Sequence, residues 1–157
     1  PLQMARFAMV IANRGWCYRP HMVHKLYDPA RHQYYKQQIA RENAAITAQS
    51  FEVIHEGMYR VVNADGGTGR ASRLEEIKVC GKTGTAQNPH GEPHAWFVGF
   101  APAQNPEVAI SVLLENAGGG GANSAPLAGM MFKRYFANQK MPAVQLAAPD
   151  SQTIALR

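Results

Sequence analysis

The chain has 157 residues, 46% of them hydrophobic, which is enough apolar material for the core of one ordinary domain. Its formal charge of +5 and pI near 9.4 do not point to a nucleic-acid partner, because lysines and arginines are scattered from Arg6 to Arg157 without a dense basic run. No stretch of about 18 apolar residues could span a membrane, and there is no signal peptide. The two cysteines, Cys17 and Cys80, are expected to be separate reduced thiols, since they form neither a Cys-x-x-Cys pair nor a disulfide framework.

The first residues of the chain have the spacing of a helix. Apolar side chains recur at intervals of three and four over residues 2–13, which predicts a helix with Gly15 at its C′ position. Residues 16–23 are aromatic and β-branched but are interrupted by Pro20, so an extended segment or an edge strand is expected there.

A polar stretch and a second helix follow. Residues 26–49 carry a turn signal at Asp28-Pro29 and little periodicity, and they are expected to form a surface excursion. Ser50 is expected to cap a helix over residues 51–63. The apolar face of that helix is expected to contain Ile54, Met58, Val61 and Val62.

Three strands are predicted in the second half of the chain, after a glycine-rich loop at residues 65–69. Residues 77–85 and 95–100 have the character of adjacent antiparallel strands separated by a turn rich in Asn, Pro, His and Gly. Residues 107–115 are almost continuously apolar, which is typical of a central strand covered on both faces.

A final helix completes the pattern. Asn123 or Ser124 is expected to cap a helix that runs to about residue 136, with Pro126 in its first turn. Residues from 139 onward lack periodicity, and a frayed tail is expected there. Helices, three antiparallel strands and a last helix together predict an α+β fold in which helices pack on an antiparallel sheet.

Two nucleotide-binding motifs are considered and rejected. Residues 81–83 read Gly-Lys-Thr, the ending of a P-loop, but the glycine required five residues earlier is Glu76, and a strand runs through the motif where a helix would begin. Gly67-x-Gly69 is followed by Ser72 and opens no βαβ unit, so it is not a dinucleotide fingerprint. No cofactor is expected.

The histidines are also not expected to bind a metal. They fall in two close pairs, and no carboxylate or cysteine cluster joins either pair to complete a set of three or four ligands. Solvated or hydrogen-bonded imidazoles are favoured, with His90 and His94 in the turn beside the strand at 77–85. The pairs are His21 with His24 and His90 with His94.

The most informative segment is Lys82-Thr83-Gly84-Thr85, which ends a short β-branched run. It resembles the third motif of the penicillin-recognising serine acyltransferases. The likeness extends over residues 79–91 and 94–102, and includes the opening Pro-Leu-Gln-Met-Ala-Arg-Phe and the glycine run at 118–121. Over roughly residues 1–137 the chain is similar to class B penicillin-binding proteins, and most similar to their elongation-type subgroup, penicillin-binding protein 2.

Two motifs of that family are missing. The family acylates the serine of a Ser-x-x-Lys motif and uses a second motif, Ser-x-Asn, and no serine of this chain begins either one. We therefore expect residues 1–138 to be the C-terminal part of a transpeptidase domain with the β-lactamase-like fold, and residues 139–157 to be the tail. Taken alone, the chain is expected to be inactive.

The resemblance implies a role for each residue of the motif. The substrate is an extended peptide ending in D-Ala-D-Ala, which pairs with the edge of the strand. Gly84 leaves room for it, while the hydroxyls of Thr83 and Thr85, on one side of the strand, are offered to its carboxylate. Lys82, on the other side, supplies positive charge, and the backbone N–H of Thr85 forms half of an oxyanion hole.

The resemblance also implies a cellular setting. The partners that it implies for the protein are peptidoglycan stem peptides, β-lactams and other wall-elongation proteins, with no nucleic acid. The location that it implies is the periplasmic face of the bacterial inner membrane, with a single-pass anchor upstream of this chain. The glycine run at 118–121 is expected to be a mobile wall of the substrate groove. A non-catalytic penicillin- or peptidoglycan-binding module on the same scaffold remains the alternative.

Overall fold

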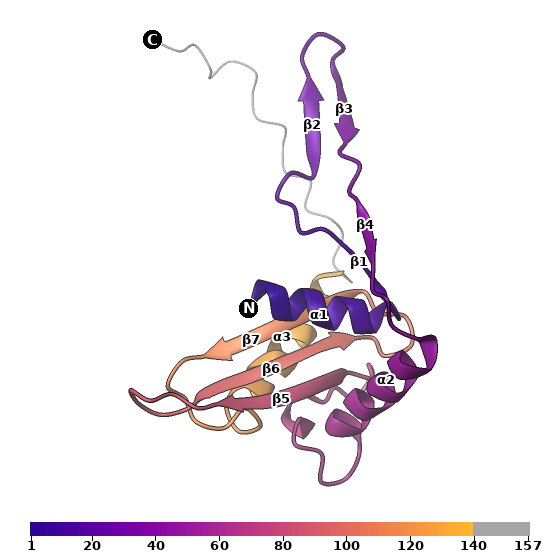
Figure 1. Ribbon diagram of the computed structural model, residues 1–157. Helices are drawn as coiled ribbons and strands as arrows, with labels where there is room; N and C mark the ends of the chain where they lie inside the picture. The colour runs from indigo at the N-terminus through magenta and orange to yellow at the C-terminus, as the bar shows by residue number, and fades with distance from the viewer. Residues whose placement is uncertain (140–157) are drawn as a thin grey trace.

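The computed structural model describes residues 1–139, and it is built around a three-stranded antiparallel sheet with helices on both faces (Figure 1). This arrangement confirms the predicted α+β class. The expected tail at 139–157 lies outside the described residues, except for its first one. The elements are α1 (Leu2–Ala12), β1 (Trp16–Tyr18), β2 (Lys25–Asp28), β3 (Gln33–Lys36), β4 (Arg41–Asn43), α2 (Ala48–Asn63), a 3₁₀ turn (Arg70–Ser72), β5 (Cys80–Ala86), β6 (His94–Ala101), β7 (Val108–Leu114) and α3 (Ser124–Gln139).

The main sheet has the strand order β5-β6-β7. The predicted pairing of the first two strands is confirmed, with Lys82 opposite Val98 and Thr85 opposite Ala95. The prediction that the third run is central is wrong within the described sheet, because β6 is central and β7 is at an edge. β7 is contacted by both α1 and α3, so both of its faces are covered by helices. This burial of its two faces, and not a neighbouring strand on each side, explains why its sequence is almost continuously apolar.

Each face of the sheet has its own apolar core. On one face, Phe97 packs in a cluster with Phe132 of α3 and Val62 of α2. On the other face, Phe100 and Cys80 pack with Ile11 of α1. Burying one phenylalanine side chain stabilises a fold by roughly 1.5–3 kcal/mol, so these two clusters hold the helices on the sheet.

The end of α1 differs by one residue from the prediction. Arg14, with φ of 53°, takes the left-handed C′ position that was predicted for Gly15. The N–H of Arg14 bonds to the carbonyl of Ile11, and the N–H of Gly15 bonds to the carbonyl of Val10, which is the Schellman arrangement. Gly15 itself has a φ of 117° and faces the ring of Phe51.

Helix α2 begins earlier than predicted. Its N-cap is Thr47 rather than Ser50, and the Thr47 side chain accepts the N–H of Ser50. Thr47 and Ser50 both carry a hydroxyl that can cap a helix, so residue type alone could not show which of them is the N-cap. Met58 and Val62 are buried as predicted, but Ile54 is exposed, because the buried face of the helix carries Phe51 instead.

The stretch at 26–49, predicted to be a surface excursion, contains β3, β4 and most of β2, while β1 confirms the extended segment predicted over residues 16–23. Strands β1 and β4 pair with each other, and β2 and β3 form a hairpin beyond them (Figure 1). The turn at Asp28-Pro29 is confirmed, since Asp28 Oδ1 accepts the N–H groups of Ala30 and Arg31. The hairpin has no strongly buried face, so its sequence lacks the alternation that reveals a strand. Within residues 1–139, no helix is long and apolar enough to cross a membrane.

Candidate functional site

The Lys-Thr-Gly-Thr segment lies on β5, at an edge of the described main sheet. Successive side chains of a strand alternate, so Thr83 and Thr85 share the α3 face with Phe97, which is opposite Thr83. Lys82 and Gly84 share the opposite face with Cys80. The predicted division of the motif between two sides of the strand is therefore present.

The hydroxyl of Thr83 is buried and already has a protein partner. Its Oγ1 lies 2.9 Å from Oγ1 of Thr68, and only 9% of the residue is exposed. Thr68 belongs to the glycine-rich loop after α2 and was not singled out from the sequence. Its contact spans fifteen residues of chain, so no local pattern could have revealed it.

Thr85 is exposed and contacts the glycine run instead. Its Oγ1 accepts the N–H of Gly120 at 3.4 Å. Gly120 lies so close to the two strands that a Cβ on it would be 2.3 Å from the carbonyl oxygen of Gly84 and 2.4 Å from that of Trp96. Gly120 is thus a buried, closely packed part of this site, and the mobility expected of the glycine run stays a prediction.

Side chains from the neighbouring turn hold the start of this loop. Nδ1 of His94 accepts the N–H of Asn116 at 3.0 Å, and the Asn88 amide donates to the side-chain oxygen of Asn116. The N–H of Gly118 bonds to the carbonyl of Pro93 at 2.8 Å. His94 therefore has a hydrogen-bonding role near the strand, as predicted, and it acts on the loop that carries Gly120.

Lys82 and Gly84 occupy the other face of β5. The Lys82 side chain is exposed, and its Nζ donates to the carbonyl of Thr83. A Cβ on Gly84 would lie 3.2 Å from Cβ of Trp96, which is a tight but not impossible contact. The side of the strand that a larger residue would fill is therefore the Trp96 side.

Cys80, two residues before the motif, is a packing residue. Burial raises the pKa of its thiol to about 12, and the negative charge of Glu56 acts in the same direction. A thiol that stays protonated is a poor nucleophile, so Cys80 does not supply an attacking group. Cys80 and Cys17 are both free and buried, which agrees with the two separate thiols expected.

Two cavities lie away from the motif. One, of about 500 Å³, is lined by residues 73–77 and the last turns of α3. The other, of about 350 Å³, lies between α1 and the start of β7. Neither is lined by Lys82 or its neighbours, which lie on a strand whose outer edge is unpaired within the described residues.

The chain was compared with known protein families and proteins. The model of the penicillin binding protein transpeptidase domain matches residues 1–133. The chain is 35% identical over 161 residues to the peptidoglycan D,D-transpeptidase MrdA of Haemophilus influenzae, covering 92% of this chain and 25% of the relative. It is 36% identical to the peptidoglycan D,D-transpeptidase PbpA of Mycolicibacterium smegmatis, covering 81% of this chain and 27% of that protein.

Solved structures give the same result. The D,D-transpeptidase domain from Eggerthella lenta is similar with a TM-score of 0.75 at 27% identity, over 89% of this chain and 33% of that one. Penicillin-binding protein A of M. tuberculosis, as a ceftriaxone acyl-enzyme complex, is similar with a TM-score of 0.71 at 32% identity, over 82% and 30%. The chain spans about a quarter of the length of the curated relatives it matches.

Proposed function

Because this chain belongs to the penicillin-binding protein transpeptidase family, with relatives of the penicillin-binding protein 2 type, we propose that it supplies the substrate strand of a peptidoglycan D,D-transpeptidase. The whole protein would cross-link stem peptides through a serine acyl-enzyme, be inhibited by β-lactams and act in cell elongation. The observation that carries the proposal is the position of Lys82-Thr83-Gly84-Thr85 on β5, whose outer edge is unpaired within the described residues.

An unpaired strand edge can bind an extended peptide by adding it as a further strand. A stem peptide ending in D-Ala-D-Ala would place its backbone along β5 and its carboxylate near the threonines. The Thr68 hydroxyl contributes here, because it can donate to Thr83 Oγ1 while Thr83 turns its own proton to the carboxylate. Lys82 would add a positive charge that favours the ionised carboxylate.

The acyl-transfer step needs groups that this chain does not contain. The nucleophilic serine would attack the penultimate carbonyl, D-alanine would leave, and the backbone N–H of Thr85 would donate to the developing oxyanion. Losing one such donor typically costs about 3–4 kcal/mol of transition-state stabilisation. The second donor and the serine belong to the Ser-x-x-Lys segment, which we place in another part of the whole protein.

The setting proposed for the whole protein follows from the same family. We place it on the periplasmic face of the bacterial inner membrane, held by an anchor outside this chain, among other wall-elongation proteins. The second candidate, a binding or sensing module, shares β5 but lacks the nucleophile. A Ser-x-x-Lys motif at the start of a helix in the whole protein would separate the enzyme from the binder.

A labelled penicillin tests the proposal directly. We expect the full-length protein to be labelled covalently at one serine, and the isolated 157-residue chain not to be labelled. Labelling of the isolated chain would show that the nucleophile lies within it. A full-length protein that binds penicillin but forms no covalent adduct would favour the binding module.

A further inference from the structure

The β2–β3 hairpin stands out from the body of the molecule (Figure 1). We call residues 25–36, which comprise the two strands and their turn, the arm. Its strands pair only with each other in the described sheets, and every residue of the arm except Asp28 is exposed. An isolated hairpin is at best marginally stable in water, so an exposed arm of this kind needs a reason.

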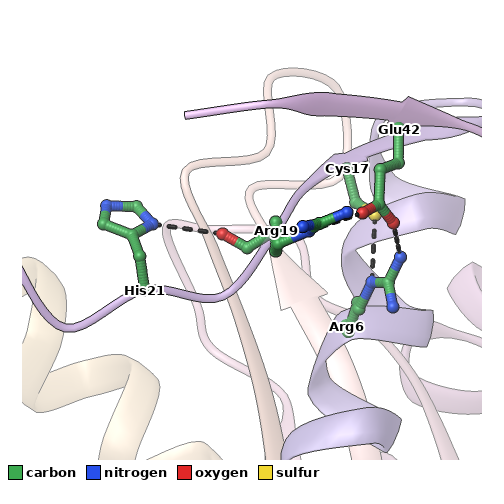
Figure 2. Close-up of polar contacts among 5 residues, drawn as sticks. All are labelled: Arg6, Cys17, Arg19, His21 and Glu42. Carbon is green, nitrogen blue, oxygen red and sulfur yellow. Dashed lines mark hydrogen bonds and ion pairs between the residues drawn. The ribbon is translucent and has the colours of Figure 1, made fainter. Parts of the chain in front are cut away.

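The base of the arm is tied to the body by ion pairs. Glu42 of β4 accepts hydrogen bonds from Arg6 of α1 and from Arg19 at the end of β1, and Arg6 Nε also donates to Sγ of Cys17 at 3.3 Å (Figure 2). The Arg41 guanidinium lies 4.2 Å from the centre of the Trp16 ring. These contacts hold together the paired strands β1 and β4, from which residues 19–24 and 37–40 lead to the arm.

One face of the arm concentrates cations and aromatic rings. Lys25 is directly opposite Lys36, and Tyr27 is directly opposite Tyr34, so all four side chains share a face. The two tyrosine rings are 5.0 Å apart at 47°, and Tyr34 is 70% exposed. We call these four residues the basic-aromatic face.

The lysine pair has no compensating charge. Like charges directly opposite one another destabilise a strand pair, and within residues 1–139 neither lysine makes an ion pair. The only carboxylate of the arm, Asp28, is on the other face and pairs with Arg31. Over the arm itself, residues 25–36, there are three arginines and lysines against this one carboxylate. The arm therefore carries an unneutralised positive charge.

We propose that the basic-aromatic face is a second binding site for peptidoglycan, separate from β5. It binds the glycan strand together with the carboxylates of the stem peptides attached to it. This rests on the proposed function for the identity of the polymer. The paired ammonium groups of Lys25 and Lys36 bind stem-peptide carboxylates, and the tyrosine rings present flat apolar surfaces with polar hydroxyls to the sugar rings.

A membrane surface fits this face less well. A segment that lies in a lipid interface gathers its aliphatic side chains on one side, with cations along the border. Here the aliphatic Leu26 is on the opposite face, beside Tyr35, and the lysines share their face with tyrosines alone. The arrangement therefore favours a polar, ring-containing anion over acyl chains.

The test measures co-sedimentation of the full-length protein with purified peptidoglycan sacculi, after acylation by labelled penicillin to block the catalytic site. The arm variant is Lys25→Gln with Lys36→Gln, which removes the repulsion between the lysines and should leave the arm folded. The matched control is Lys133→Gln with Arg134→Gln, which removes the same two charges from exposed positions on α3.

We expect the arm variant to bind sacculi about five- to tenfold more weakly than the wild type, and the control to bind within about twofold. Tyr34→Leu, which keeps apolar area but removes the ring, should also bind more weakly. Equal loss in the arm variant and the control would overturn the proposal, as would arm-dependent binding to anionic phospholipid vesicles without binding to sacculi.

The labelling step keeps this test separate from the proposed function. All variants should be acylated by penicillin like the wild type, because none of the substituted residues lies on β5. If the wild type is not acylated, the proposed function fails. If it is acylated but does not bind sacculi through the arm, only this proposal fails.

Discussion

Replacing Gly120 by alanine tests whether this position needs a glycine because of its close packing against β5 and β6 or because of its backbone flexibility. The added Cβ would lie 2.3 Å from the Gly84 carbonyl oxygen and 2.4 Å from that of Trp96. Carbon–oxygen contacts of this kind normally begin at about 3.3 Å, so the loop must move by about 1 Å or the strands must separate. Both oxygens belong to the backbone of paired strands and cannot rotate away.

The expected effect has two parts. Overpacking a fitted site typically costs about 1–3 kcal/mol, so the free energy of unfolding of the full-length protein should fall by that amount. A displacement of about 1 Å beside the reacting groups can reduce a rate on the order of a hundredfold. Because Gly120 donates to Thr85, we expect penicillin acylation to slow accordingly.

Gly119→Ala is the matched control. A Cβ at Gly119 would meet no heavy atom within 4 Å. The same substitution there should leave acylation unchanged and can raise the free energy of unfolding by about 0.4–1 kcal/mol through the unfolded state. The two variants would be compared by stopped-flow acylation and by thermal unfolding. If Gly120→Ala behaves like Gly119→Ala in both assays, the loop does not rest on β5 as described.

Three further predictions concern β5. Gly84→Val should abolish acylation, and near-normal acylation would mean that the substrate does not lie along this strand. The same substitution should lower the free energy of unfolding by about 1 kcal/mol, because the new Cβ would lie 3.2 Å from Cβ of Trp96. Lys82→Ala should slow acylation at low salt and remove most of the salt dependence of the rate, while an unchanged salt profile would exclude a role for its charge. Cys80, whose pKa is raised to about 12 from 9.0, should resist alkylation at pH 8 in the folded protein. Because that pKa is raised by folding, stability should be complete below pH 9 and fall as pH rises toward 12, and a flat profile in urea titrations would contradict this.

The sequence predicted the strand that carries the motif because the relevant signals are local. A β-branched run, a turn rich in Asn, Pro and Gly, and a second apolar run are enough to indicate two antiparallel strands. Alternation along the strand then separates Thr83 and Thr85 from Lys82. Helix α1 was predicted for the same reason, and only its cap was misplaced, at Gly15 instead of Arg14.

Other features depended on contacts between distant parts of the chain. The partner of Thr83 is Thr68, and the residue that covers Gly84 is Gly120, which is separated from it by two strands. Neither contact follows from spacing, because each is made only when the sheet brings the loops together.

The arm and the order of the sheet show the same limit. An apolar run such as β7 indicates that both of its faces are covered, but it does not indicate which strands lie beside it. The arm shows the opposite case, because strands with no buried face leave no hydrophobic period to detect. The amino-acid sequence by itself therefore determined the family, the fold class and the motif strand, since these depend on local composition and alternation. Tertiary structure alone decided strand order, the fit of Gly120 and the exposure of the lysine pair, since these depend on which surfaces meet when the chain packs.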